Sequence, residues 1–91
     1  MMNKKNIIIR VYGRVQGVGF RYYAHQAAVS LDVSGYVCNE TDGSVYIEAE
    51  GSTDNLPVFL EWCKRGPARA VISDIKHYEG PLMNYNSFII R

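Results

Sequence analysis

The residues best suited to chemistry lie in one short stretch, residues 11–21, which reads VYGRVQGVGFR. Three glycines, Gly13, Gly17 and Gly19, separate an apolar run from a helix-forming segment. A strand that turns through glycines into a helix start directs several main-chain N–H groups to one point, and the positive end of the helix dipole lies behind them. We therefore predict an anion site suited to phosphate at this loop.

Two side chains could add chemistry to such a loop. Arg21 is the second residue of the predicted helix, where its planar guanidinium can reach back over the same N–H groups and bind phosphate oxygens. Asn39 ends a short predicted strand just before a turn, where the common role of an asparagine is to cap the turn. Its amide could instead hold a water molecule in line for attack on a phosphoryl group. The choice between these roles depends on whether Asn39 lies near the loop.

The glycine spacing matches neither of the two common nucleotide-binding motifs. The loop has no Gly-Lys-Ser/Thr ending, and the positions of its glycines depart from the dinucleotide fingerprint. Binding of ATP, GTP or NAD is therefore disfavoured. Taken alone, a glycine-rich turn of this kind is more often only a turn.

The elements that must position these residues follow from the hydrophobic pattern. Residues 7–12 are fairly apolar on both faces, with Arg10 the one charged residue, which predicts a central strand. From Phe20 onward the spacing becomes helical. The predicted apolar stripe of this helix consists of Phe20, Ala24, Ala27 and Leu31.

A hairpin is predicted in the middle of the chain. Residues 35–39 form one strand, residues 40–43 a turn in which Gly43 takes a positive φ, and residues 45–50 the returning strand. The residues expected on a solvent-exposed face of the returning strand are Tyr46, Glu48 and Glu50.

The rest of the chain predicts a second helix and two more strands. The helix begins near Asp54 or Asn55, either of which can cap it, and ends at residues 66–67, a Gly-Pro pair. A fourth strand is predicted over 70–78 and a short last strand over 88–91. The predicted buried stripe of the helix consists of Leu56, Phe59, Leu60 and Cys63.

This order, β-α-β-β-α-β with a short terminal strand, predicts an α+β fold. Two helices would cover one face of an antiparallel sheet, which is a ferredoxin-like sandwich. A length of 91 residues suits one domain, 1–91, with no linker and no internal repeat.

Composition and charge argue against several classes of function. A formal net charge of +1 provides no basic surplus to attract nucleic acid or a membrane surface. No apolar run approaches the roughly 18 residues that span a bilayer, and residues 1–6 do not begin a secretory signal. Cys38 and Cys63 make neither a disulfide framework nor a metal-ligand set. We therefore expect a cytoplasmic protein that has reduced thiols.

Several segments together resemble the acylphosphatase family. They are residues 13–21, 34–39, 42–45 and 66–67, the last followed by Ala70-Val71. The resemblance runs over nearly the whole chain, and the nine-residue loop 13–21 is its most specific part. It implies the sandwich described above and metal-independent hydrolysis of the carboxyl–phosphate anhydride bond of acyl phosphates, which yields carboxylate and inorganic phosphate.

The resemblance also implies roles for individual residues. Arg21 is similar to the family's phosphate-binding arginine, and Asn39 to the asparagine that positions the attacking water. The main-chain amides that match the phosphate cradle are those of Gln16, Gly17, Val18, Gly19 and Phe20. The partners implied are a small acyl phosphate substrate and inorganic phosphate as product or inhibitor, with no cofactor, and we expect the chain to be a monomer.

The chain departs from the family pattern at two places. Cys38 stands where the family commonly has a basic residue before the asparagine, and Leu31-Asp-Val33 replaces the usual Leu-Gly-Leu. These changes concern substrate preference or local stability, because neither alters Arg21 or Asn39.

Two other classes of function fit part of the pattern. One is a non-catalytic phosphate- or anion-binding regulatory module on the same fold, with a pocket but no positioned water. The other is a nucleic-acid-binding sandwich with aromatic residues on its open face. The second lacks both the usual RNA-binding signature and a basic surplus, so it is disfavoured.

Overall fold

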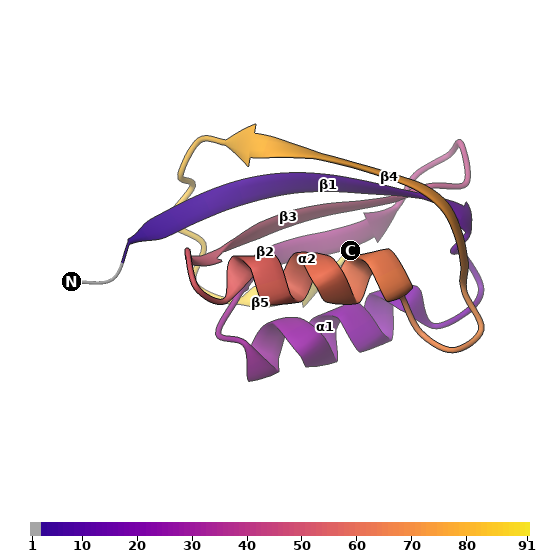
Figure 1. The fold of residues 1–91 in the computed structure, drawn as a ribbon, viewed down its shortest axis with the longest axis horizontal. Coiled ribbons are helices and arrows are strands. Elements are labelled where there is room, and N and C mark those ends of the chain that lie inside the picture. Colours follow the sequence, from indigo (N-terminus) through magenta and orange to yellow (C-terminus); the bar gives the residue numbers. More distant parts are fainter. Residues whose placement is uncertain (1–2) are drawn as a thin grey trace.

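The computed structural model describes residues 3–91, so the first two residues of the predicted domain 1–91 lie outside the described part. Within residues 3–91, two helices lie on one face of a five-stranded sheet, in the predicted order of elements (Figure 1). The elements are β1 (Lys4–Arg14), α1 (Phe20–Ser30), β2 (Ser34–Asn39), β3 (Val45–Ser52), α2 (Leu56–Arg65), β4 (Val71–Gly80) and β5 (Phe88–Ile90).

The strand order β4-β1-β3-β2-β5 confirms the predicted ferredoxin-like sandwich and the interior position of β1. The first four strands pair antiparallel, as predicted. The short strand β5 pairs parallel to β2, so the whole sheet is mixed. β5 runs parallel to β2 because residues 81–87 first carry the chain from the end of β4, at one edge of the sheet, to the opposite edge.

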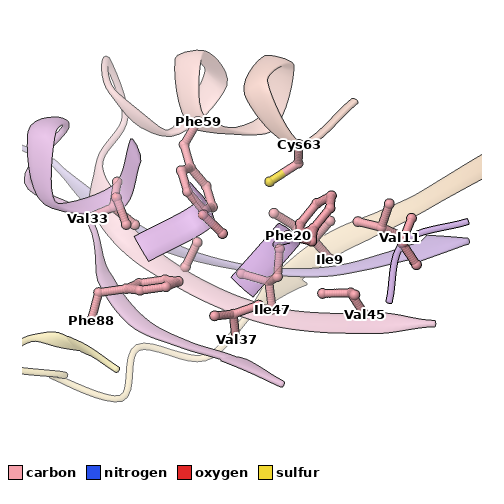
Figure 2. Packing of buried hydrophobic residues seen from close by; sticks show 14 of the residues in the cluster. Ile9, Val11, Phe20, Val33, Val37, Val45, Ile47, Phe59, Cys63 and Phe88 are labelled. Carbon is pink, nitrogen blue, oxygen red and sulfur yellow. The ribbon is translucent and has the colours of Figure 1, made fainter. Parts of the chain in front are cut away.

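The core lies between the helices and the sheet. Figure 2 shows Phe59 of α2 and Phe20 at the start of α1 among aliphatic side chains of the strands. Both rings are almost fully buried, and Phe59 meets Phe88 of β5 in an edge-to-face contact with 6.0 Å between ring centroids. Burial of an aromatic side chain of this size contributes about 1.5–3 kcal/mol. The core therefore fixes the start of α1, where the loop that follows β1 ends.

The predicted buried stripe of α1 is correct in part. Phe20 and Ala24 are buried, but the third buried residue is Ala28 rather than the predicted Ala27. Residues four apart lie on one line along a helix, so 20, 24 and 28 share the face toward the sheet. Ala27 and Leu31 pack against the edge of the core.

The predicted end of α2 at Gly66-Pro67 is confirmed, but the predicted N-terminal cap is wrong in its chemistry. Asn55 occupies the N-cap position, but its side chain makes no capping hydrogen bond. Its amide donates to the Leu31 carbonyl oxygen at 2.9 Å, which ties α2 to the end of α1. The Ser52 hydroxyl, at the end of β3, instead accepts a hydrogen bond from the Asn55 N–H at 3.0 Å.

Glu50 was expected on a wet face of the sheet, and that expectation is wrong. The residue is only 1% exposed, because residues 81–87 cover the end of β3. Its carboxylate accepts hydrogen bonds from the main-chain N–H groups of Met83, at 2.7 Å, and Tyr85, at 3.0 Å. A buried carboxylate needs such donors, which explains why an acidic residue is tolerated there.

Asp32 has a φ of 56°, in the left-handed region that costs non-glycine residues about 1–2 kcal/mol. We therefore expect Asp32→Gly to raise the free energy of unfolding by about 0.5–1 kcal/mol, after the extra chain entropy of glycine is subtracted. Urea unfolding of both proteins measures this difference. As a control, Asp32→Val should lower the free energy of unfolding, since a β-branched residue fits this conformation poorly. A glycine variant no more stable than the parent would contradict the prediction.

Candidate active site

The loop between β1 and α1 has the form required of an anion site. Val15 and Val18 are buried and hold the loop against the core. Gly17 and Gly19 have φ values of 72° and 82°, which residues with a side chain rarely adopt. Within residues 3–91, the main-chain N–H groups of residues 16–19 have no hydrogen-bond acceptor. They are therefore available to a bound anion.

Not every glycine of the motif belongs to this loop. Gly13, predicted as part of it, lies within β1 at a shift in the register between β1 and β4. A side chain there would collide with the Val71 carbonyl oxygen of β4. Gly13 therefore allows the close approach of two strands, and the candidate anion-binding part of the motif starts after Arg14.

A pocket of about 260 Å³ opens beside the loop. Arg21 comes from the first turn of α1 and Asn39 from the end of β2, yet both side chains lie on this pocket. The residues that line it are Val15, Gly17, Gly19, Phe20, Arg21, Tyr22, Asn39 and Ile90. The fold thus brings the two predicted polar side chains to the glycine loop.

Asn39 does not cap the hairpin turn. That role belongs to Asp42, whose carboxylate accepts hydrogen bonds from the Ser44 hydroxyl at 2.6 Å and the Ser44 N–H at 2.9 Å. These two bonds hold the pKa of Asp42 below its usual range. Within residues 3–91 the Asn39 amide has no hydrogen-bond partner, although it is half-buried. Its amide is therefore free to bind a water molecule in the pocket.

Arg21 is held at the pocket by one hydrogen bond. Its Nη1 donates to the Arg91 carbonyl oxygen at 3.0 Å. In the part of the chain that the structure describes, no Asp or Glu side chain forms an ion pair with Arg21. A guanidinium has five N–H donors, so most of them and the full positive charge remain for an anion.

The acylphosphatase family model matches residues 7–90. The chain belongs to the acylphosphatase family. It is similar to the acylphosphatase of Thermotoga maritima, with 46% identity over 87 residues that make up 96% of this chain and 97% of the relative. It is also 47% identical to the acylphosphatase of Salinibacter ruber over 72 residues, 79% of this chain and 76% of that one.

Solved acylphosphatase structures share the fold closely. The Coxiella burnetii acylphosphatase superposes with a TM-score of 0.94 at 34% identity, covering 98% of this chain and 94% of that one. The Bacillus subtilis acylphosphatase superposes with a TM-score of 0.92 at 39% identity, covering 94% and 97%. As a member of this family, the chain hydrolyses acyl phosphates, and phosphate is a product.

Two of the predicted acylphosphatase cradle residues do not line the pocket. The Val18 side chain is buried and lies on a neighbouring pocket with Tyr23 and Trp62. The Gln16 side chain donates to the Glu40 carbonyl oxygen at 2.7 Å and to that of Ser44 at 2.9 Å. Any contact of Gln16 and Val18 with substrate would therefore use their main-chain N–H groups.

The Gln16 hydrogen bonds have a structural consequence that the sequence pattern did not reveal. They tie the phosphate loop of this acylphosphatase to both ends of the β2–β3 hairpin turn, directly beside Asn39. The loop and Asn39 are thereby held at one end of the sheet. No local signal identifies this role, because the acceptors are main-chain carbonyl groups.

Sequence analysis also missed two residues at the C-terminal end of the acylphosphatase domain. Ile90 forms an apolar wall of the pocket, and Arg91 supplies the carbonyl oxygen that holds Arg21. Both reach the site only because β5 pairs beside β2.

The other polar groups of the described residues indicate neither a metal site nor a reactive thiol. Among residues 3–91, no group of three His, Cys, Asp or Glu side chains could hold a metal ion. Cys38 and Cys63 form no disulfide with each other, and burial raises the pKa of both thiols. No helix in the described ranges is long and apolar enough to cross a membrane.

Proposed function

We propose that the chain hydrolyses the carboxyl–phosphate anhydride bond of acyl phosphates by in-line attack of a positioned water, without a metal ion. The observation that carries this proposal is the position of Arg21 and Asn39 on one pocket with the unpaired N–H groups of the glycine loop. The relatives named above are all acylphosphatases and give no support to a non-catalytic anion-binding module.

The loop and Arg21 bind the phosphoryl group. The N–H groups of residues 16–20 and the guanidinium surround its oxygens and stabilise their charge as it redistributes in the transition state. The departing carboxylate is a weak base, so it leaves without strong protonation. Placement and charge stabilisation are then the main tasks left to the protein.

Asn39 positions the nucleophile. Its amide oxygen accepts a hydrogen bond from a water molecule and holds the water oxygen opposite the leaving carboxylate oxygen. Among residues 3–91, no Asp, Glu or His lines the pocket. The water's proton therefore passes to an oxygen of the phosphoryl group, which makes the substrate its own base.

We further infer that residues 1–91 act as one domain, as a monomer in the cytoplasm, with no cofactor and no nucleic-acid partner. The net charge of +1 and the absence of a disulfide between Cys38 and Cys63 are consistent with this setting. Inorganic phosphate, the product, should compete with substrate for the same loop.

Hydrolysis of benzoyl phosphate with and without a chelator tests the proposed chemistry. We expect kcat/KM to agree within about twofold between about 5 mM EDTA and added Mg²⁺. The groups that bind the phosphoryl oxygens and the water are main-chain N–H groups, a guanidinium and an amide, and none of them needs a metal. Inorganic phosphate should inhibit competitively. Loss of activity in EDTA that Mg²⁺ restores would contradict a metal-independent reaction.

A further inference from the structure

The face of the sheet that the helices leave open carries three tyrosines around one carboxylate. The hydroxyls of Tyr36, Tyr46 and Tyr85 donate to Glu48 at 3.2, 2.7 and 2.6 Å. Burial opposes the charge of Glu48, but these donors and Arg91 outweigh it and hold the pKa of that carboxyl below its usual range. We call these four residues the tyrosine cluster. Its centre is an ionised carboxylate that fixes three phenol rings.

One ring of the tyrosine cluster supports Arg91. The Arg91 guanidinium carbon lies 3.8 Å from the centroid of the Tyr36 ring, which is the geometry of a cation–π pair. The ring cannot turn freely, since its hydroxyl is bound to Glu48 and Tyr85 packs edge-on against it at 6.2 Å. Tyr36 therefore presents a fixed flat surface to the arginine.

Arg91 joins this surface to the active site. Its N–H donates to the Val37 carbonyl oxygen at 2.8 Å, and its carbonyl oxygen accepts the hydrogen bond from Arg21 Nη1 at 3.0 Å. Its side chain lies on Tyr36 while its main chain contacts Arg21. A contiguous path thus leads from the open face of the sheet to the guanidinium at the pocket.

The end of β5 needs such support. The strand has three residues, and of these only Phe88 is buried, whereas Ile89 and Ile90 are 45% and 46% exposed. Short exposed strand ends open locally at little cost in free energy. If Arg91 leaves its place, Arg21 loses its hydrogen-bond partner and its long side chain gains rotamer freedom that phosphate binding must then remove.

We propose that Tyr36 is a positioning residue for acyl phosphate hydrolysis: its ring holds Arg91, whose carbonyl oxygen keeps the Arg21 guanidinium at the pocket. This inference rests on the proposed function, because the role of Arg21 belongs to it. The single N–H that Arg21 gives to Arg91 leaves the others for phosphate oxygens. Tyr36 acts through two residues and need not touch the substrate.

Two substitutions separate the ring from the hydroxyl. Tyr36→Leu removes the aromatic face, and we expect it to lower kcat/KM for benzoyl phosphate and weaken inorganic phosphate inhibition by about tenfold each, the size of a partly desolvated cation–π pair. Tyr36→Phe keeps the ring and loses only the bond to Glu48, so it should stay within about threefold of the parent. Urea unfolding of both variants separates this effect from general destabilisation, because a loss of phosphate affinity in a fully folded Tyr36→Leu variant requires a change at the site.

Tyr46→Leu is the matched control. Tyr46 lies on the neighbouring strand, donates to the same Glu48 and packs against the Tyr36 ring at 5.8 Å. Arg10 lies above its ring at 4.8 Å, and within residues 3–91 no hydrogen bond joins Arg10 to Arg21. This variant removes an arginine–tyrosine pair of the same kind but leaves the Tyr36–Arg91 pair in place, so it should change kcat/KM by less than about threefold, well below the loss in Tyr36→Leu.

Arg91→Leu keeps the inference testable even if Tyr36→Leu folds poorly, because the Arg91 side chain is exposed. It should reproduce the loss seen in Tyr36→Leu, and the double variant should lose no more than either alone, since both remove one pair. Wild-type kinetics in Arg91→Leu, or additive losses in the double variant, would overturn the inference. So would an equal loss in Tyr46→Leu. A parent protein that fails to hydrolyse benzoyl phosphate would instead overturn the proposed function.

Discussion

Replacing Arg21 by alanine is expected to lower kcat/KM for benzoyl phosphate roughly a hundred- to a thousandfold, since loss of one preorganised donor to transition-state charge costs about 3–4 kcal/mol. Within residues 3–91 no Asp or Glu side chain pairs with Arg21, so its guanidinium remains available to an anion in the pocket. Inorganic phosphate should bind more weakly as well, because the guanidinium contacts the phosphoryl oxygens before and during the reaction.

Two further variants test whether the site needs the guanidinium of Arg21 or only a positive charge nearby. Arg21→Lys should recover little activity, because a point charge cannot replace two parallel donors in a plane. Arg14→Ala removes an equal charge just before the same loop, from an exposed residue that does not line the pocket, and should change kcat/KM only a few-fold. Equal losses in Arg14→Ala and Arg21→Ala would show that the site needs only positive charge nearby.

Replacing Asn39 by alanine should lower kcat by a similar factor, about a hundredfold or more, while leaving the affinity for inorganic phosphate within about threefold. The difference from Arg21→Ala follows from what each side chain contacts. Asn39 binds the water in our proposal, and the phosphate donors on the loop and on Arg21 remain in place. Steady-state kinetics and competitive inhibition by phosphate measure the two effects separately.

Stability is the necessary control for this variant. The Asn39 amide has no hydrogen-bond partner within residues 3–91, so its removal should change the free energy of unfolding by less than about 1 kcal/mol. Hydrolysis of benzoyl phosphate at the parent rate would show that Asn39 does not position the water. A parallel loss of phosphate binding would place Asn39 among the phosphate ligands instead.

The elements of the fold could be predicted because their signals are local. The change from strand spacing to helical spacing at Phe20 requires only neighbouring residues, and the Gly66-Pro67 stop after α2 is a matter of backbone conformation. Local signals failed to predict burial where a contact with a distant segment determines it. Glu50 looks like a solvent-exposed residue in its strand, and only the covering segment with Met83 and Tyr85 makes it buried.

At the site, too, features that depend on residue type could be predicted, and contacts with distant segments could not. The chemical types of Arg21 and Asn39 could be read from the sequence, and the family resemblance assigned roles to both. The sequence could not say that Asp42, rather than Asn39, caps the hairpin. It also could not predict that the Gln16 side chain binds carbonyl groups instead of facing the pocket. Hydrogen bonds to main-chain groups leave no residue-type pattern to detect.

By itself, the sequence determined the family, the order of helices and strands, and the loop whose glycines permit positive φ values. Each of these depends on residue type and short-range spacing. Only the tertiary structure decided that Asn39 lies on the same pocket as Arg21, and that Arg91 at the end of β5 holds the Arg21 guanidinium. These contacts join residues 18 and 70 positions apart, which meet only after the sheet has assembled.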